Sequence, residues 1–227
     1  MARYTILPMH PAILLFARSP EREASAKRMR FAAPLFRALV ATWLDAAQRH
    51  GATPVIACAE EDREALASIA PHIGREWIEQ RGTTFGERVA RAADEAFARF
   101  DAVLIAAIDA PPHHLGKALR KLAEGTPVLS PSRDGGINFI GLVHPEPELL
   151  AQLRCGRRDA ARSAAGTAAF HMVGSTIDLD DESSIAIART DRAWRSLLTR
   201  PLPAPPRTRG PEDPGIPLSR SPRAPPH

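Results

Sequence analysis

The sequence DGGINFIGL at residues 134–142 places a carboxylate and two glycines at the start of an apolar, strand-like run. An apolar segment at 127–130 precedes it, and a proline-rich break at 145–147 follows it. Glycine pairs occur where the backbone adopts a positive φ or approaches another group closely. An Asp-Gly pair between apolar runs is also a strong hairpin signal. The stretch therefore predicts either a plain hairpin turn or a turn whose carboxylate, Asp134, reaches a metal ion or a substrate hydroxyl.

Three other runs, at residues 12–17, 54–59 and 102–108, are apolar throughout and long enough for a strand. Such runs are typical of strands buried on both faces of a parallel sheet. The segments between and after them have the spacing of helices, and they are 32–50, 61–70, 84–100 and 113–123. This alternation predicts an α/β fold with a mostly parallel central sheet and helices on both faces.

The rest of the chain adds shorter elements and a tail. Further strands are expected at 76–79, 127–130, 136–143 and 171–173, and further helices at 149–153, 157–170 and 184–198. Asp178 and Asp180 are expected at the start of the last helix, where carboxylates suit the helix dipole. Ten of the 27 residues from 201 to 227 are proline. We expect one domain over residues 1–200 and a disordered proline-rich tail over 201–227.

Charge and composition exclude several classes of protein. The formal net charge is +4 over 227 residues. Four arginines and two acidic residues of the tail account for +2, so residues 1–200 also carry only +2. A nearly neutral domain lacks the strong positive electrostatic field that attracts a polyanion such as nucleic acid. Aromatic residues make up only 5% of the chain, too few for stacking platforms on single-stranded nucleic acid. No nucleic-acid partner is expected.

The cysteines and the apolar runs indicate the environment. Cys58 and Cys155 lie far apart and outside any metal-binding spacing, which argues against a disulfide framework and a structural zinc site. No apolar run approaches the roughly 20 residues of a membrane span. The first residues lack the pattern of a secretory signal. A soluble, cytoplasmic protein without a membrane partner is expected.

Candidate site residues fall at the expected carboxyl ends of strands, where open α/β sheets bind ligands. A polar segment rich in basic residues, 18–30, follows the first strand and precedes a helix, an arrangement that binds phosphates. Asp109 ends the run 102–108, and Asp134 precedes the Gly-Gly strand. Mg²⁺ in proteins takes one or two carboxylates together with phosphate oxygens. These groups together predict a nucleotide site, although Asp109 as a helix cap and the basic residues as solvated charges are the alternatives.

Several motifs together resemble one bacterial family. The sequences FARSP at 16–20 and KRM at 27–29 resemble its opening, "FaKaPvpGrvKTRL". The motifs GTTFGERV at 82–89 and AIDAP at 107–111 resemble "GdLGeRm" and "GsDcP", and DGGINFIGL resembles "DGGYYLIGL". The family is that of the radical-SAM- and selenodomain-associated transferases, which are glycosyltransferase-A-like proteins with a nucleotide-diphospho-sugar transferase fold. The segment DLDDE at 178–182 is similar to an element of molybdenum-cofactor guanylyltransferases.

The resemblance implies roles for particular residues. Asp109 and Asp134 would be the catalytic and metal-binding carboxylates, with Mg²⁺ or Mn²⁺ as the cofactor. The residues implied in nucleotide binding are Ala17, Arg18, Lys27, Arg28, Gly82 and Arg88. Those implied in substrate binding are Gly135, Gly136 and Asn138.

The resemblance implies a transferase that uses a nucleotide-activated donor, a nucleotide sugar above all, and a small-molecule acceptor. One alternative is a nucleotidyltransferase that releases pyrophosphate from a nucleoside triphosphate. Another is a relative without catalytic activity that binds a nucleotide or a partner. The second alternative arises because the segment 20–25 lacks the glycine of the family's loop and the loop is shorter. Fold alone does not choose among these activities.

Overall fold

A computed structural model describes residues 9–29, 31–153 and 157–199. The predicted tail at 201–227 therefore lies outside the described residues. The described chain forms one seven-stranded sheet in the order β3-β2-β1-β4-β6-β5-β7. Its strands are β1 (Pro11–Phe16), β2 (Thr53–Cys58), β3 (Glu76–Glu79), β4 (Ala102–Ala107), β5 (Val128–Pro131), β6 (Ile137–Leu142) and β7 (His171–Met172).

The sheet is mostly parallel, as the sequence predicts. Strand β1 pairs in parallel with β2 and β4, and β2 pairs in parallel with β3. Strand β6 is antiparallel to both β4 and β5. The antiparallel strand brings its first residues to the edge of the sheet where the parallel strands end. The turn that contains Asp134 and the end of β4 therefore lie at the same edge.

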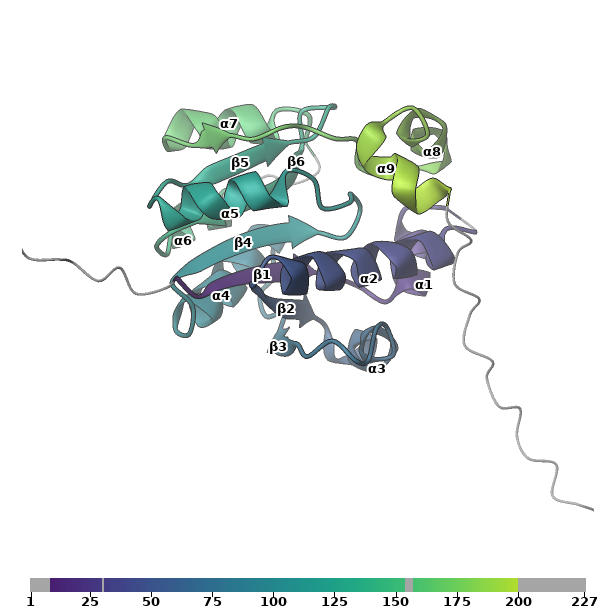
Figure 1. Cartoon of the computed structure of the whole chain (residues 1–227), viewed down its shortest axis with the longest axis horizontal. Helices are drawn as coiled ribbons and strands as arrows, with labels where there is room; N and C mark the ends of the chain where they lie inside the picture. The colour runs from purple at the N-terminus through teal and green to yellow at the C-terminus, as the bar shows by residue number, and fades with distance from the viewer. Residues whose placement is uncertain (1–8, 30, 154–156, 200–227) are drawn as a thin grey trace, which may run out of the picture.

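Helices cover both faces of this sheet (Figure 1). In chain order they are α1 (Pro20–Ala26), α2 (Ala33–Arg49), α3 (Arg63–Ala67), α4 (Phe85–Phe97), α5 (Leu115–Ala123), α6 (Pro147–Ala151), α7 (Ala160–Thr167), α8 (Glu182–Ala188) and α9 (Arg192–Leu198). A short 3₁₀ turn, Glu60–Asp62, precedes α3. Helices α2 and α5 pack on one face, and α4, α6 and α7 pack on the other. The predicted fold class is confirmed.

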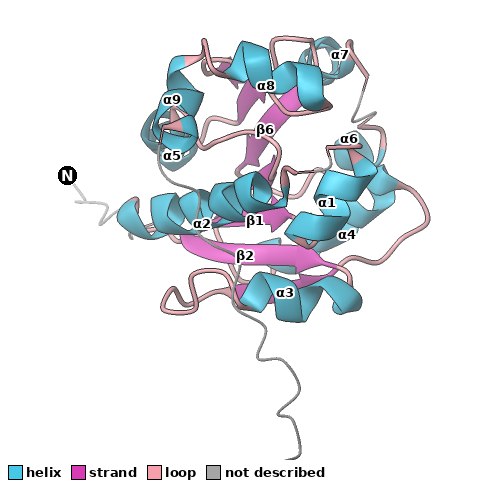
Figure 2. Ribbon diagram, turned by 90° about the vertical axis from the view of Figure 1, so that its right-hand side faces the viewer, coloured by secondary structure: helices cyan, strands magenta, loops and turns pink. Residues whose placement is uncertain are grey.

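The short helices α1, α8 and α9 gather at the carboxyl end of the parallel strands. Figure 2 views the molecule from this end, with α1 and α8 in front of the sheet. Together with α2 they enclose a small core of their own, which includes Met29, Phe36, Leu179 and Trp194. This core fixes the segments on either side of the sheet edge where the candidate residues lie.

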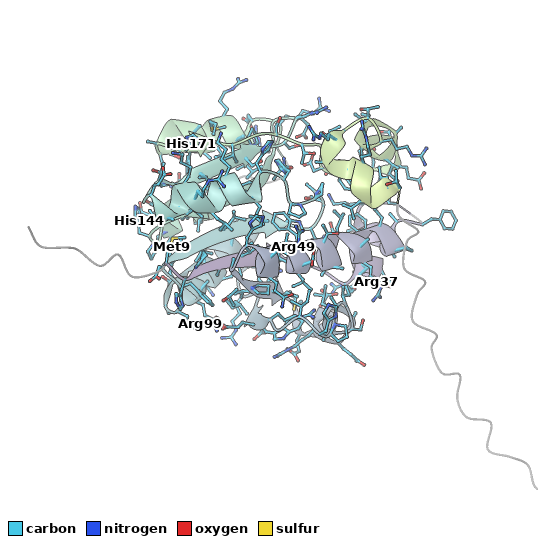
Figure 3. All side chains as sticks on the ribbon, in the orientation of Figure 1. Met9, Arg37, Arg49, Arg99, His144 and His171 are labelled. Carbon is cyan, nitrogen blue, oxygen red and sulfur yellow. The ribbon has the colours of Figure 1, made fainter. Side chains whose placement is uncertain are left out.

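The opposite end of the sheet is where the parallel strands begin. Figure 3 shows Met9, Arg99, His144 and His171 at this end, away from α1, α8 and α9. Met9 lies two residues before the start of β1, and His171 begins β7. The candidate residues of the sequence analysis are therefore separated from these residues by the length of the strands.

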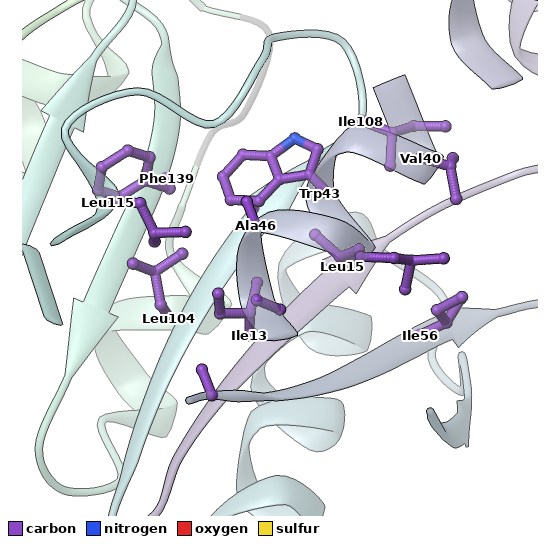
Figure 4. Packing of buried hydrophobic residues seen from close by; sticks show 14 of the residues in the cluster. Ile13, Leu15, Val40, Trp43, Ala46, Ile56, Leu104, Ile108, Leu115 and Phe139 are labelled. Carbon is purple, nitrogen blue, oxygen red and sulfur yellow. The ribbon is translucent and has the colours of Figure 1, made fainter. Parts of the chain in front are cut away.

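The core on the α2 face is built around Trp43. Its ring is fully buried and lies edge-on to Phe139 of β6, with 6.4 Å between the ring centres. Figure 4 shows Trp43 above Ile13, Leu15 and Leu104 of the central strands. The indole Nε1 donates a hydrogen bond of 2.8 Å to the carbonyl oxygen of Ala110. This bond ties the loop after β4, and with it Asp109, to the rigid core.

The segment 18–30 differs from the predicted basic loop, because residues Pro20–Ala26 form α1. Proline at the first helical position suits a helix start, since its missing N–H would have had no partner there. Glu21 and Glu23 in the first turn also favour a helix. Ser19 N donates to the buried carboxylate of Asp62, and Arg22 pairs with the same carboxylate. The helix is therefore anchored to the loop after β2, a contact that local sequence does not indicate.

The structure has two helices, α8 and α9, where one helix was predicted at 184–198. The predicted place of Asp178 and Asp180 at the start of that helix is wrong. Asp181, rather than Asp178 or Asp180, caps α8 by accepting hydrogen bonds from Ser183 N and Ser184 N. Asp191 then interrupts the helix and caps α9. The Asp191 carboxylate is buried and pairs with Arg133, which holds the break in place. Asp178 and Asp180 are left in the extended segment ahead of α8.

Candidate functional site

A pocket of about 430 Å³ opens at the carboxyl ends of β1 and β4, beside the first residues of β6. Its walls also come from α1, the first turns of α4 and the segment before α8. The residues singled out from the sequence that line it are Ala17, Arg18, Lys27, Arg88, Asp109, Asp134, Gly136 and Asn138. One cavity thus brings together side chains separated by more than a hundred residues.

Three of the predicted site residues are not among the pocket-lining residues in the described part of the chain. They are Arg28, Gly82 and Gly135. Arg28 has a φ of 56° and ends the turn after α1. A Cβ added to Gly82 would meet Arg88 N and Glu87 Cβ at 3.0 Å, so this glycine lets the loop pack on the start of α4. Both residues shape the backbone beside the pocket.

The polar end of the pocket is a cluster of carboxylates. Among the described residues, one oxygen each from Asp109, Asp178 and Asp180 lies within 4.8 Å of the other two. A backbone hydrogen bond of 2.9 Å from Leu179 N to the Asp109 carbonyl oxygen holds the two segments together. Residues 178 and 180 flank Leu179, which explains why their side chains reach Asp109. Asp134 lines the same pocket but does not belong to this group of three.

Lys27 lies against this cluster. Its Nζ donates to Asp109 Oδ2 at 3.0 Å and to Asp180 Oδ1 at 3.1 Å. Glu23 Oε1 lies 4.0 Å away, one helical turn earlier in α1. The Lys27 side chain is only 14% exposed. Burial lowers its pKa, but the attraction of Asp109, Asp180 and Glu23 outweighs burial, so the pKa stands above its ordinary value. Lys27 is therefore a fixed cation among carboxylates.

The carboxylate of Asp178 belongs to this cluster and is partly buried. Burial raises its pKa to about 6, against an ordinary value of 3.8. The hydroxyl of Ser132 donates to Asp178 Oδ1 and lowers the pKa in part, while the nearby charges of Asp109, Asp134 and Asp180 raise it. At neutral pH and without a bound cation, the ionised carboxylate of Asp178 therefore destabilises the folded chain.

This raised pKa gives a testable dependence of stability on pH. In the folded protein Asp178 binds a proton up to about pH 6, whereas in the unfolded chain it loses that proton near 3.8. Its contribution to stability therefore falls as pH rises from about 4 to 6. Asp178→Asn should raise the free energy of unfolding by about 1–2 kcal/mol at pH 7.5 in EDTA, with no gain at pH 4. Urea unfolding at both pH values measures this. The exposed Asp94→Asn is the control, and an equal effect of both substitutions at pH 7.5 would contradict the raised pKa.

The Asp134 turn joins β5 to β6, as the hairpin interpretation predicts, and its carboxylate lines the pocket. Contact of this carboxylate with a metal ion or a substrate stays a prediction. Asp134 Oδ1 accepts a hydrogen bond of 2.9 Å from Gly136 N. A Cβ on Gly136 would lie 3.2 Å from Asp134 Oδ1 and 3.7 Å from Asp178 Oδ2. The absence of a side chain at position 136 therefore lets these two carboxylates face the same space.

Gly135 serves the turn rather than the pocket. Its φ is +98°, and a Cβ added there would overlap the carbonyl oxygen of Arg158. Its own carbonyl oxygen accepts a hydrogen bond from Ala161 N in α7. Gly135→Ala should therefore lower the free energy of unfolding by about 2 kcal/mol more than Gly125→Ala, which shares a positive φ but meets nothing within 4 Å. Equal losses in urea unfolding would show that the contact with Arg158 does not constrain the turn.

The first turn of α4 forms the wall opposite the carboxylates. Thr84 caps this helix, and Glu87 completes a capping box. The Arg88 guanidinium lies over the Phe85 ring, 5.7 Å from its centre. Phe85 in turn lies edge-on to Phe16, with ring centres 5.7 Å apart. The cap thus fixes one basic and one aromatic side chain at the pocket.

Four polar pocket residues were not predicted as site residues: Glu23, Gln80, Asp178 and Asp180. Gln80 Nε2 donates to the Ala57 carbonyl oxygen at 2.7 Å, which orients the amide at the ends of β2 and β3. The two aspartates belong to the motif DLDDE, and their alternate spacing is the signal that could have indicated them, since such positions share one side of an extended segment. Glu23 and Gln80 carry no comparable signal in the sequence.

The charges of the pocket suit a divalent cation. Five carboxylates and three basic side chains are among its described lining residues, which leaves a formal charge of −2 when all are ionised. The three clustered carboxylates offer hard oxygen ligands of the kind that Mg²⁺ and Mn²⁺ prefer. Burial raises the pKa of Asp178 and the neighbouring carboxylates raise it further, and a bound cation would offset this cost of ionisation. The residues present therefore fit a divalent metal ion.

The seven-stranded, mostly parallel sheet with helices on both faces is the nucleotide-diphospho-sugar transferase fold, which solved structures share with this chain. The chain belongs to the family DUF2064, "Uncharacterized protein conserved in bacteria", whose model matches residues 42–157. No curated protein sequence matches the chain significantly.

Solved structures share the fold at low sequence identity. One is a protein from Desulfovibrio desulfuricans G20 that is provisionally named a nucleotide-diphospho-sugar transferase. It matches with a TM-score of 0.68 and 22% identity over 84% of this chain and 94% of that chain. Rv0371c from Mycobacterium tuberculosis H37Rv, in complex with manganese, matches with a TM-score of 0.51 and 14% identity over 79% and 97% of the two chains. A nucleotidyl transferase from Methanothermobacter thermautotroptrophicus, Mth528, has a TM-score of 0.51 and 14% identity over 84% and 100%.

Within residues 9–29, 31–153 and 157–199, no helix is both long and apolar enough to cross a bilayer.

Proposed function

We propose that this protein is a metal-dependent transferase that binds a nucleotide-activated donor, a nucleotide sugar, in the pocket between β1, β4 and β6. The observation that carries the proposal is the contact of Lys27 with Asp109 and Asp180 at the sheet edge where such folds bind ligands. This contact places one cation and two carboxylates where the diphosphate and the metal ion would lie side by side. The likeness in fold to nucleotide-using proteins supports the same assignment.

The basic residues of the pocket would hold the phosphates. Arg18 lies just after β1, and Lys27 lies at the end of α1. Arg88 lies on the opposite wall. When a diphosphate binds, the Lys27 ammonium can exchange one carboxylate partner for a phosphate oxygen without leaving the cluster. Charge-assisted hydrogen bonds of this kind are stronger than neutral ones. These side chains would therefore stabilise the negative charge that develops on the leaving nucleotide.

The carboxylates would hold the cation and the acceptor. Asp109, Asp178 and Asp180 are the residues that would bind Mg²⁺ or Mn²⁺. The metal, when bound, neutralises charge on the diphosphate and so assists its departure. Asp134 and Asn138 lie on the β6 side of the pocket, where they would orient the donor sugar or the acceptor. The transfer breaks the bond between the sugar and the diphosphate, forms a bond from the sugar to the acceptor, and releases a nucleoside diphosphate.

Nucleotidyl transfer from a nucleoside triphosphate, with release of pyrophosphate, is the second candidate. The likeness to Mth528 favours it. It also agrees with the similarity of the DLDDE segment to guanylyltransferases. A relative that binds a nucleotide without catalysis is the third candidate, because α1 replaces the glycine-containing loop that the family motif carries.

Product identification separates these candidates. The protein is first screened by thermal shift against nucleoside triphosphates, diphosphates and nucleotide sugars, with and without Mn²⁺. The nucleotides that raise the melting temperature are then incubated with a mixture of small alcohols, amines and sugar phosphates, and the products are identified by mass spectrometry. A nucleoside diphosphate as product supports the proposal, pyrophosphate supports nucleotidyl transfer, and binding without product supports the third candidate. Failure of every nucleotide to bind would refute all three.

A further inference from the structure

The pocket has a second half that the proposed function does not use. On the side that faces α4, its lining is apolar and comes from β1, β4, β6, α4 and the residue Leu153. The main side chains of this apolar floor are Phe16, Val89, Ile105, Ile137, Ile140 and Leu153. Ile105 and Ile140 are paired across β4 and β6, so the floor is part of the sheet surface itself. A rigid surface of this kind keeps its shape without a ligand.

The floor is not filled by the protein. Its residues belong to the core on the α4 face, and yet they border a cavity. Protein interiors are close-packed, and an unfilled space forfeits the dispersion contacts of the side chains around it. The side chains Val89, Ile105 and Ile140 could have been larger and closed the space. An open apolar space next to a polar cluster is typical of a ligand site.

One buried polar atom borders the same space. Asn138 is 1% exposed and lines the pocket. Its Nδ2 donates to the carbonyl oxygens of Pro131 at 2.9 Å and Thr176 at 3.2 Å, which fixes the orientation of the amide. Its Oδ1 is buried and has no hydrogen-bond partner among the described residues. A buried acceptor without a partner is costly, so this atom suits a hydrogen-bond donor on a ligand.

The position of the floor indicates which substrate would occupy it. Arg18 follows β1 and Gln80 follows β3, on the side of the pocket where the nucleotide would bind. Ile137, Ile140 and Asn138 belong to β6, on the opposite side of the carboxylate cluster. A molecule on the β6 side would reach the carboxylates from the side away from the nucleotide, which suits an acceptor.

We propose, on the basis of the function above, that the acceptor is a compact molecule with an apolar body and a single hydroxyl or amine. The apolar body would lie on the floor beneath β6 and α4. The hydroxyl or amine would lie near Asn138 Oδ1 and the carboxylate cluster. A sugar or another polyhydroxylated acceptor would leave most of its polar groups against apolar side chains, which is unfavourable.

Methyl NMR of the full chain tests the proposal with defined probes. Isoleucine and leucine methyl groups are labelled, and benzyl alcohol, benzyl methyl ether and glucose are titrated separately. Benzyl alcohol should shift the signals of Ile137, Ile140 and Leu153 saturably. Benzyl methyl ether lacks the donor for Asn138 and should bind about fivefold more weakly, the scale of one hydrogen bond. Glucose should leave these signals unchanged. Shifts of these signals by glucose and not by benzyl alcohol would overturn the proposal.

A pair of variants locates the binding. Ile137→Tyr places a larger side chain over the floor and should weaken benzyl alcohol at least tenfold. Ile187→Tyr changes an exposed residue of α8 and should leave its affinity unchanged. Nucleotide binding with Mn²⁺ is measured on the same samples. Nucleotide binding without any binding of benzyl alcohol would refute only the apolar acceptor. Binding of benzyl alcohol without any nucleotide would instead refute the proposed transferase, and the acceptor assignment with it.

Discussion

Replacement of Lys27 by methionine is expected to abolish nucleotide-dependent stabilisation and to lower the free energy of unfolding by about 3 kcal/mol. The nearly buried ammonium contacts two carboxylates and lies 4.0 Å from a third. Removal of one partner from a buried ion pair leaves an uncompensated charge, which costs on the order of 3–5 kcal/mol. The lower value applies here because Asp180 is largely exposed. Because the Lys27 pKa stands above its ordinary value, this contribution is complete at neutral pH.

Urea unfolding and a thermal-shift titration with nucleotide measure the two effects. Lys117→Met removes an exposed lysine of α5 and serves as the control for loss of charge. Mn²⁺ should stabilise the Lys27→Met variant more than the original protein, because three carboxylates remain without their internal cation. Unchanged nucleotide binding in the variant would show that Lys27 is only a structural ion-pair partner.

Asp109→Asn is expected to weaken the Mn²⁺-dependent binding of nucleotide roughly 100-fold, equivalent to about 3 kcal/mol. Asp109 is the member of the carboxylate cluster that ends a central strand, and its backbone is tied to Trp43 and Leu179 through neighbouring hydrogen bonds. The substitution keeps the shape of the side chain but removes the charge that the cation needs. Without ligand, it should cost no more than about 1 kcal/mol, since the amide oxygen can still accept from Lys27.

Isothermal titration with Mn²⁺ and a nucleoside diphosphate gives the affinity of each variant. Asp45→Asn removes an exposed carboxylate from the back of α2 and should bind as tightly as the original protein. Full binding by Asp109→Asn would exclude this carboxylate from the metal and nucleotide site.

The fold could be predicted from the sequence because its signals are local. The apolar runs at 12–17 and 102–108 became β1 and β4, and the Thr84 to Glu87 spacing became the cap of α4. Each depends on residues within one element. The pocket position followed from the same signals, since parallel strands share a carboxyl edge.

The composition of the carboxylate cluster could not be predicted in the same way. Asp178 and Asp180 reach Asp109 only through the Leu179 backbone hydrogen bond, a contact between residues 70 apart. The sequence around them equally suits a helix cap, and Asp181 does cap α8. The helix α1 was missed for a similar reason, because its anchor is Asp62 in another loop. Both the carboxylate cluster and the position of α1 depend on contacts between residues that lie far apart in the sequence.

Asp134 shows that one residue can close a turn and also line a pocket. The side chain closes the hairpin turn through Gly136 N and still lines the pocket. Sequence alone treats these as alternatives, because a turn signal and a ligand signal use the same residue types. In the folded chain the antiparallel β6 carries the turn to the carboxyl edge of the sheet, so the turn residue also lies at the pocket, and its contact with a ligand stays a prediction.

The most direct test of a metal and nucleotide site is the anomalous diffraction of a crystal soaked with Mn²⁺ and a nucleoside diphosphate. The predicted result is an anomalous peak at about 2.2 Å from oxygens of Asp109 and at least one of Asp178 and Asp180, with diphosphate density beside Lys27. A peak at another surface, or ordered nucleotide density outside this pocket, would contradict the assignment.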